Sequence, residues 1–157
     1  MDKRARILVI DDDESIRKVL VAILEDEGFA VDTAENGKTA IKKSNEKFYN
    51  LALIDIRLPD MEGTELLTKL KDTIPKMRKI MVTGYPSLQN AVEALNKGAH
   101  AYIVKPFDLK KVIAVIKEQL WKQQEEKEYS QEKVKEFIET RVRELEKEKA
   151  ATSKKYH

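Results

Sequence analysis

The sequence contains no cysteine, which excludes disulfide bonds, thiol chemistry and thiolate metal sites and fits a cytoplasmic protein. It also has little net charge, since 30 Lys and Arg stand against 28 Asp and Glu, so charge gives no reason to expect binding to a membrane or to nucleic acid. No apolar run approaches the ~20 residues of a transmembrane helix. The apolar residues 7–10 are also too few for a secretory signal, which needs roughly 7–15.

What the sequence does contain is a series of short apolar runs that alternate with amphipathic segments. Such runs, bounded by turn signals, are typical of strands buried on both faces. We predict five strands near residues 7–10, 29–34, 51–54, 80–82 and 102–104. Apolar residues at spacings of three and four predict five helices between and after them. Gly28 and Gly98 are expected to end two of these helices, and Asp108 to cap the last.

Alternating strands and helices indicate an α/β fold with a parallel sheet covered by helices on both faces. Right-handed crossovers leave few topologies, and we predict a doubly wound sheet with the strand order 2-1-3-4-5. This order places the first and third strands side by side where the winding reverses. Ligands of such sheets bind there, beyond the carboxyl ends of the strands.

Residues with reactive or charged side chains follow four of the predicted strands at this edge. Asp11 and Asp12 follow the first strand, Asp55 the third, Thr83 the fourth and Lys105 the fifth. Three converging carboxylates would repel one another, and hard oxygen ligands without nearby His or Cys favour Mg²⁺ as the ion that relieves the repulsion. An aspartate can accept a phosphoryl group, whose oxygens a hydroxyl and an ammonium would then contact. We therefore predict that Asp55 is a phosphoryl acceptor.

Each of these residues also has a purely structural explanation when it is taken alone. Asp11 and Asp12 could cap the following helix, where negative charge is favoured, and Asp55 could form a turn. Thr83 could be structural, and Lys105 could be an ordinary loop lysine. The whole pattern favours a site, because independent accidents would not place these residue types at four strand ends in order.

The set of motifs resembles the receiver domain of two-component response regulators, a chemotaxis-regulator-like domain with a flavodoxin-like fold. The matching stretches lie within about residues 5–121 and read ILVIDDDESIR, LALIDIRLPDMEG, IMVTGYPS and AYIVKPF. The resemblance implies that Asp55 is the phosphoacceptor. It also implies that Asp12 binds Mg²⁺ directly and that Asp11 holds the ion through water.

The resemblance assigns roles to further residues around the same strand ends. The backbone carbonyl of Arg57 would complete the metal shell, and Lys105 would be the lysine typical of the family. Thr83 would be the switch hydroxyl, and Tyr102 the aromatic residue whose rotamer follows it. The peptide bond before Pro106 is expected to be cis.

In this family a sensor histidine kinase supplies the phosphoryl group, and small phosphodonors such as acetyl phosphate can replace it. The receiver itself catalyses transfer and later hydrolysis, so the resemblance implies a phosphoacceptor regulator and not a conventional enzyme. Phosphorylation shifts a two-state equilibrium that a face comprising residues 87–120 reads out. We also expect Arg57 and Tyr85, which flank Asp55 and Thr83 in sequence, to slow hydrolysis by crowding the attacking water.

Two other functions fit part of the sequence. A haloacid-dehalogenase-type phosphatase would use Asp11 as nucleophile, since Asp11, Asp13 and Ser15 have the Asp-x-Asp-x-Ser spacing. That family expects an acidic pair on a strand after the lysine, where this chain has only Asp108, and it leaves Asp55 without a role. The second alternative is a receiver fold that acts as an interaction module without phosphorylation, and the complete set of site residues argues against it.

The composition changes to Glu, Lys, Gln and Arg after about residue 121, so we predict a receiver domain at residues 1–121 and a charged helical tail at residues 122–157. We expect this helix to be broken near Ser130 and frayed over residues 150–157. The tail has ten Lys and Arg against nine Glu, so direct binding of nucleic acid is not expected.

The tail also carries a short row of residues near heptad spacing, which predicts a weak coiled-coil-like seam. Its members are Val134, Ile138, Arg141 and Leu145, flanked by Phe137 and Val142. We predict a homodimer through this helix or through the face at residues 87–120. A helix that docks a partner, or a linker to an effector domain, is the alternative role of the tail.

Overall fold

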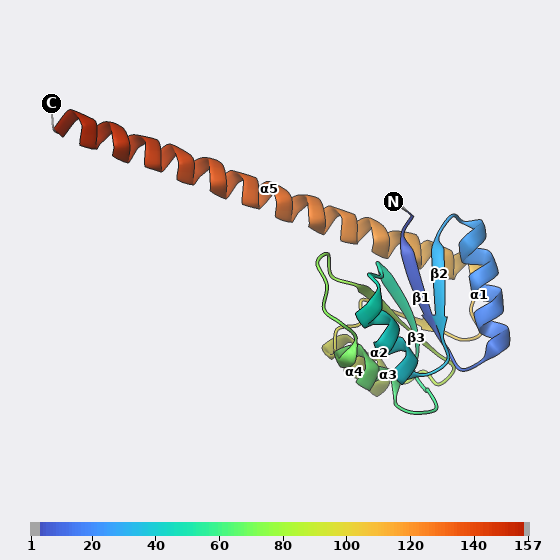
Figure 1. The fold of residues 1–157 in the computed structure, drawn as a ribbon. Helices are drawn as coiled ribbons and strands as arrows, with labels where there is room; N and C mark the ends of the chain where they lie inside the picture. The colour runs from blue at the N-terminus through green and yellow to red at the C-terminus, as the bar shows by residue number, and fades with distance from the viewer. Residues whose placement is uncertain (1–3, 156–157) are drawn as a thin grey trace. The chain divides into compact units, whose positions relative to one another are not determined.

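The structure, a computed structural model, describes residues 4–155 of the chain. Strands and helices alternate along it (Figure 1). In chain order the elements are β1 (Arg6–Ile10), α1 (Glu14–Asp26), β2 (Ala30–Ala34), α2 (Gly37–Glu46), β3 (Leu51–Asp55), α3 (Gly63–Lys69), β4 (Arg78–Thr83), α4 (Leu88–Asn96), β5 (Ala101–Val104) and α5 (Leu109–Lys155). The chain divides into two compact units, one ending at Gln123 and one beginning at Gln124. None of the described helices is long and apolar enough to cross a membrane.

The first unit is built on a parallel five-stranded sheet in the order β2-β1-β3-β4-β5. The predicted α/β fold and its doubly wound topology are therefore confirmed. β3 pairs with β1 on one side and with β4 on the other, so it lies in the centre of the sheet. Every residue of β3 and β4 is buried, because helices cover both faces of the sheet.

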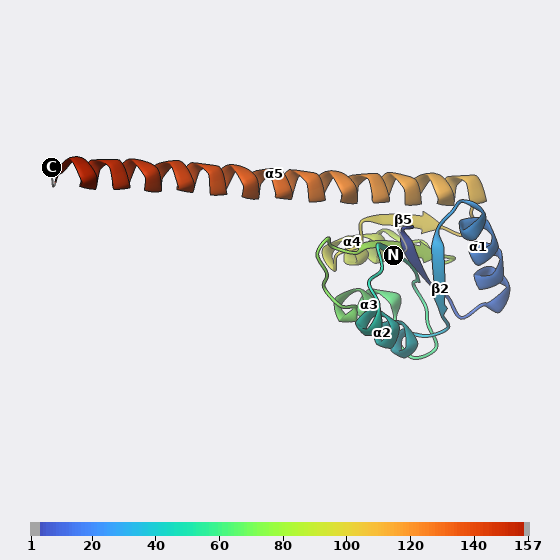
Figure 2. The same cartoon turned by 45° about the horizontal axis from the view of Figure 1, so that its top comes forward.

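Two apolar cores, one on each face of the sheet, hold the helices in place. On one face the strands pack against α1, through residues such as Leu24, and against the first turns of α5, through Ile116. On the other face they pack against Ala40 of α2, Leu66 of α3 and Ala94 of α4, and α2 and α3 lie side by side (Figure 2). Because strand side chains alternate between the faces, both cores fix the register of the strands and the position of their ends.

The start of α1 shows which aspartate caps this helix. Asp13, not Asp11 or Asp12, caps this helix, because its carboxylate accepts a hydrogen bond from the backbone N–H of Ile16. A capping role therefore does not account for Asp11 and Asp12.

The other predicted helix ends are confirmed. Gly28 and Gly98 follow α1 and α4 with φ angles of 94° and 103°, a region that favours glycine. At the start of α5, Asp108 Oδ1 accepts a hydrogen bond of 2.9 Å from the backbone N–H of Lys110. Asp108 thus caps the helix as its sequence position indicates.

The long helix α5 is continuous to Lys155, so the predicted break near Ser130 is wrong. The expected fraying is not seen up to Lys155 either, and residues 156–157 lie outside the described range. Glu, Lys, Gln and Arg are strong helix formers, and ion pairs one turn apart support an exposed helix. Two such pairs are Lys133–Glu136 and Arg141–Glu144.

Candidate functional site

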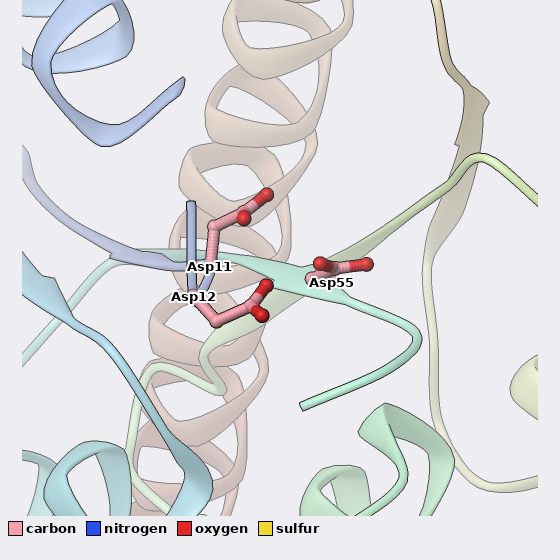
Figure 3. A group of neighbouring side chains, drawn as sticks. All are labelled: Asp11, Asp12 and Asp55. Atoms are coloured by element: carbon pink, nitrogen blue, oxygen red, sulfur yellow. The ribbon is translucent and has the colours of Figure 1, made fainter. Parts of the chain in front are cut away.

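The carboxyl ends of the central strands bring three aspartates together at one edge of the sheet. Asp11 and Asp12 follow β1, and Asp55 is the last residue of β3. One carboxylate oxygen from each of the three residues lies within 4.8 Å of the other two, and the side chains are shown in Figure 3. Asp11 and Asp55 are buried, whereas Asp12 is exposed. The aspartates that the sequence placed at the strand ends are therefore close enough to share one ion.

Lys105, which follows β5, places its ammonium beside this cluster. Its Nζ lies 2.9 Å from Asp11 Oδ2 and 3.5 Å from Asp55 Oδ2. Burial disfavours the ammonium, but the hydrogen bond and charge of Asp11 and the charge of Asp55 outweigh burial, so the pKa of Lys105 is raised. The peptide bond between Lys105 and Pro106 is cis, as the resemblance implied.

The fold makes Asp55 hard to ionise. Its pKa is raised, first because burial removes water from the carboxylate and second because Asp11 repels it, while Lys105 and the backbone N–H of Arg57 act in the opposite direction. One ammonium among three carboxylates leaves an excess of two negative charges when all are ionised. A divalent cation would balance this excess, and a donor set made only of carboxylates fits Mg²⁺.

Thr83 and Tyr102 lie on β4 and β5, the two strands on the side of β3 away from β1. Thr83 ends β4 and is fully buried, and its Oγ1 accepts a hydrogen bond of 2.9 Å from the backbone N–H of Tyr85. Tyr102 lies on β5, and its buried hydroxyl has no hydrogen-bond partner among the described residues. A buried hydroxyl without a partner is unfavourable.

Arg57 and Tyr85 lie against each other near Asp55. The guanidinium carbon of Arg57 is 4.0 Å from the centroid of the Tyr85 ring, within the range of a cation–π contact. The backbone N–H of Arg57 lies 3.4 Å from Asp55 Oδ1, so Arg57 also contacts Asp55. Sequence reasoning placed both side chains near the site but contained no signal for their contact.

Two features of the loop after β3 were not predicted from the sequence. A Cβ at Gly63 would clash with the backbone carbonyl oxygen of Asp55, so this close approach requires glycine. Asp60 accepts hydrogen bonds of 2.9 Å from the backbone N–H groups of Gly37 and Lys38 at the start of α2, and these bonds lower the pKa of Asp60. No local pattern reveals a bond that spans more than twenty residues. The bonds tie the loop that carries Arg57 to α2.

Comparison with known proteins identifies the family. The family model of the response regulator receiver domain matches residues 7–117. The chain belongs to the response regulator receiver family. The receiver is 41% identical over 114 residues to the transcriptional regulatory protein ZraR of Klebsiella oxytoca. It is 34% identical over 126 residues to the DNA-binding transcriptional regulator NtrC of Proteus hauseri.

These matches cover most of this chain but little of the relatives. They include 73% and 80% of the chain, against 26% of ZraR and 27% of NtrC. The chain therefore spans about a quarter of the length of the curated relatives it matches. The residues matched by the family model end at 117, before the second compact unit begins.

Solved receiver structures agree with this fold. A response regulator receiver domain protein (CheY-like) from Methanospirillum hungatei JF-1 superposes with a TM-score of 0.76 at 49% identity, covering 79% of this chain and 99% of that chain. A response regulator from Burkholderia pseudomallei, solved with a phosphorylated aspartic acid, a calcium ion and citrate, has a TM-score of 0.68 at 32% identity, covering 78% and 72%. The predicted receiver identity is confirmed, and none of these matches favours a haloacid-dehalogenase-type phosphatase.

Proposed function

We propose that this receiver is a phosphorylation-dependent switch in which Asp55 accepts the phosphoryl group from a sensor histidine kinase. The position of Asp55 carries the proposal: it is buried at the end of β3, close to two further carboxylates and 3.5 Å from Lys105 Nζ. Asp11, the rival nucleophile, is more fully engaged. One of its oxygens lies 2.9 Å from Lys105, and the other accepts the backbone N–H of Asp13.

The other site residues would act on the charge of the phosphoryl group. Asp11, Asp12, Asp55 and the backbone carbonyl of Arg57 would hold Mg²⁺, and the bound ion supplies positive charge to the phosphoryl oxygens. Lys105, which already contacts Asp55, would bind a further phosphoryl oxygen. The raised pKa of Asp55 supports a need for these cations, because the nucleophile must be ionised to attack.

In the transfer step an oxygen of Asp55 attacks phosphorus while the bond from phosphorus to the imidazole nitrogen of the kinase phosphohistidine breaks. In the later hydrolysis step, which ends the signal, water attacks the same phosphorus and releases inorganic phosphate and the free carboxylate. We propose that the receiver catalyses both steps itself, including phosphorylation by acetyl phosphate. Arg57 and Tyr85, which stack beside Asp55, would hinder the attacking water.

Thr83 and Tyr102 would convert phosphorylation into a changed surface. The Thr83 hydroxyl, now bonded to the backbone N–H of Tyr85, would turn towards a phosphoryl oxygen. Tyr102, whose hydroxyl lacks a partner among the described residues, would change rotamer with it. The face at residues 87–120 would then favour its partner-binding state. Exposed apolar side chains on α4 support this assignment.

We further propose a receiver domain at residues 1–121 followed by a charged tail at residues 122–157, supported by compact units that meet between Gln123 and Gln124. Two copies would pair through the tail or through the face at residues 87–120. A cytoplasmic location is supported by the histidine kinase as partner and by the lack of cysteine. The balanced charge of the tail supports the absence of direct nucleic-acid binding by this chain.

Incubation with acetyl phosphate and Mg²⁺, followed by intact-mass measurement, tests the proposal. We expect one phosphoryl group on the wild type and none on Asp55→Asn or in the presence of EDTA. Asp26→Asn removes an exposed carboxylate at the end of α1 and is the matched control, which should be phosphorylated like the wild type. A wild type that gains no mass would overturn the proposal and support an interaction module that works without phosphorylation.

A further inference from the structure

The second half of α5 carries a row of apolar side chains on an otherwise charged surface. Every described side chain from residue 124 to residue 152 is exposed. Five large apolar residues gather within three turns and keep about half or more of their surface exposed: Val134 (58%), Phe137 (71%), Ile138 (54%), Val142 (47%) and Leu145 (48%). They occupy ~140° of the helix circumference. Apolar surface gathered in this way marks an interaction site.

The spacing of these residues matches the heptad positions of a two-stranded coiled coil. The core a and d positions are Val134, Ile138, Arg141 and Leu145, and the bordering e and g positions are Phe137, Val142, Glu144 and Lys149. All five apolar residues then fall on the seam or on its border. An alternative frame with Ile138 at a d position leaves Phe137 outside the seam, so it accounts for less of the exposed apolar surface.

We propose that residues 134–149 of two copies pair as a parallel, in-register coiled coil. The inference rests on the pairing of two copies proposed above and adds its direction and register. In a parallel pair each g residue faces the e residue five positions later on the other helix. Phe137 then meets Val142 of the second copy, and Glu144 meets Lys149. Two-fold symmetry repeats each contact, so the border gains two apolar contacts and two pairs of opposite charge.

An antiparallel pair does not use the same surface well. The alignment that stacks all four core layers places Ile138 opposite Arg141 of the second copy. At the border it places Lys135, which follows Val134 and is also an e residue, beside Val142. Both contacts set a charged group against an apolar side chain, and desolvating a charge without a partner is unfavourable. The contacts at the border, where the parallel pair joins Phe137 to Val142 and Glu144 to Lys149, therefore favour the parallel direction.

Arg141 is the weak layer of the proposed seam. In a parallel pair its two copies face each other at a d position, where like charges oppose association. Within its own helix the Arg141 guanidinium lies 3.1 Å from Glu144 Oε2, which draws the charge towards the border. Three apolar core layers interrupted by one Arg layer give a weak dimer, whose population depends on protein concentration.

Sedimentation of the full chain over a concentration series tests the pairing. Arg141→Leu should tighten dimerisation by about tenfold or more, because it completes the apolar seam. Lys149→Glu should weaken it by about threefold to tenfold, and adding Glu144→Lys to that variant should restore it. Lys147→Glu makes the same charge change outside the seam and is the matched control. A chain that stays monomeric even with Arg141→Leu overturns the inference.

Disulfide cross-linking tests the direction, and the absence of cysteine makes the chain suited to it. Leu145→Cys should cross-link to itself on oxidation, because a residue meets its own copy only in a parallel, in-register pair. Cross-linking of Leu145→Cys to Val134→Cys in a mixture, without self-linkage of either, overturns the proposed direction but leaves the pairing intact. Phosphorylation of Asp55 is measured separately by intact mass, so failure of the coiled coil is distinguishable from failure of the switch.

Discussion

Replacing Asp55 by asparagine is expected to raise the stability of the metal-free receiver at pH 7, although it removes the proposed acceptor. An oxygen of Asp11 lies within 4.8 Å of one of Asp55, so at an effective dielectric constant of ~20 their repulsion amounts to ~3.5 kcal/mol or more, against an attraction of ~4.7 kcal/mol to Lys105 at 3.5 Å. These two effects oppose each other, and the loss of water around the buried carboxylate, which is the largest cause of its raised pKa, decides the sign. We expect a gain of about 1 kcal/mol in the free energy of unfolding.

The pH dependence of this gain follows from the direction of the pKa shift. The wild type is destabilised at pH values above the raised folded-state pKa of Asp55, where its carboxylate is charged. As the pH falls through that pKa, the folded wild type takes up a proton and the destabilisation is lost. The difference between wild type and Asp55→Asn should therefore shrink on acidification.

Asp11→Asn is the matched comparison and should have the opposite effect. Asp11 Oδ2 lies 2.9 Å from Lys105 Nζ, and Oδ1 accepts the backbone N–H of Asp13. Without this carboxylate, Asp55 at 3.5 Å is the one ion-pair partner that the largely buried ammonium keeps among the described residues. We expect a loss of about 2 kcal/mol, less than for a fully buried pair because some water reaches the site.

Mg²⁺ should reduce or reverse the difference in the free energy of unfolding between wild type and Asp55→Asn. A ligand at a hundred times its Kd stabilises the folded state by ~2.7 kcal/mol, and the variant binds the ion with one carboxylate fewer. Urea unfolding followed by near-ultraviolet circular dichroism reports buried Tyr49 and is insensitive to the backbone of the tail helix. Two results together would refute this reasoning: Asp55→Asn is less stable than wild type in EDTA, and Mg²⁺ raises the free energy of unfolding equally in both proteins.

Three further predictions concern other residues of the receiver. Lys105→Met should slow phosphorylation by acetyl phosphate about 10²-fold, because the ammonium beside the proposed acceptor is lost. The rate is measured from the intact mass over time, and an unchanged rate would show that Lys105 has no role in the reaction. Arg57→Ala and Tyr85→Ala should each shorten the half-life of the phosphorylated protein by admitting water, and unchanged half-lives would contradict this. Lys79 is buried and its pKa is lowered by burial, so its charge destabilises the fold below that pKa and the effect is relieved as the pH rises towards 10.5. Lys79→Met also removes the hydrogen bond that Lys79 Nζ donates to Leu67 O, so the prediction concerns the change with pH. The free energy of unfolding of Lys79→Met relative to wild type, from urea unfolding, should be higher at pH 7 than at pH 10, and a constant difference would contradict the assignment.

The sheet and the residues at its edge were predictable because each depends on a short stretch of sequence. The apolar run at residues 51–54 reads as a strand buried on both faces, and the residue after it must lie at the carboxyl edge. Which aspartate caps α1 was not predictable, because three acidic residues follow one another. Only the backbone decides it: Asp13 is extended, with φ −81° and ψ 112°, and its carboxylate reaches the N–H of Ile16.

Contacts between residues that are distant in the sequence were also not predictable. The bonds from Asp60 to α2 and the stacking of Arg57 on Tyr85 depend on how the loops after β3 and β4 approach their neighbours. The break expected at Ser130 failed for a local reason. A single serine costs a helix only about half a kcal/mol relative to alanine, and the strong helix formers around it outweigh that cost.

Mapping the phosphorylated residue tests the assignment of Asp55 most directly. Borohydride reduces an aspartyl phosphate to homoserine, so peptide mass spectrometry after acetyl phosphate and Mg²⁺ treatment identifies the acceptor by position. We predict homoserine at position 55 and unmodified aspartate at positions 11 and 12. Homoserine at position 11 with position 55 intact would contradict the assignment and would support the phosphatase-type nucleophile instead.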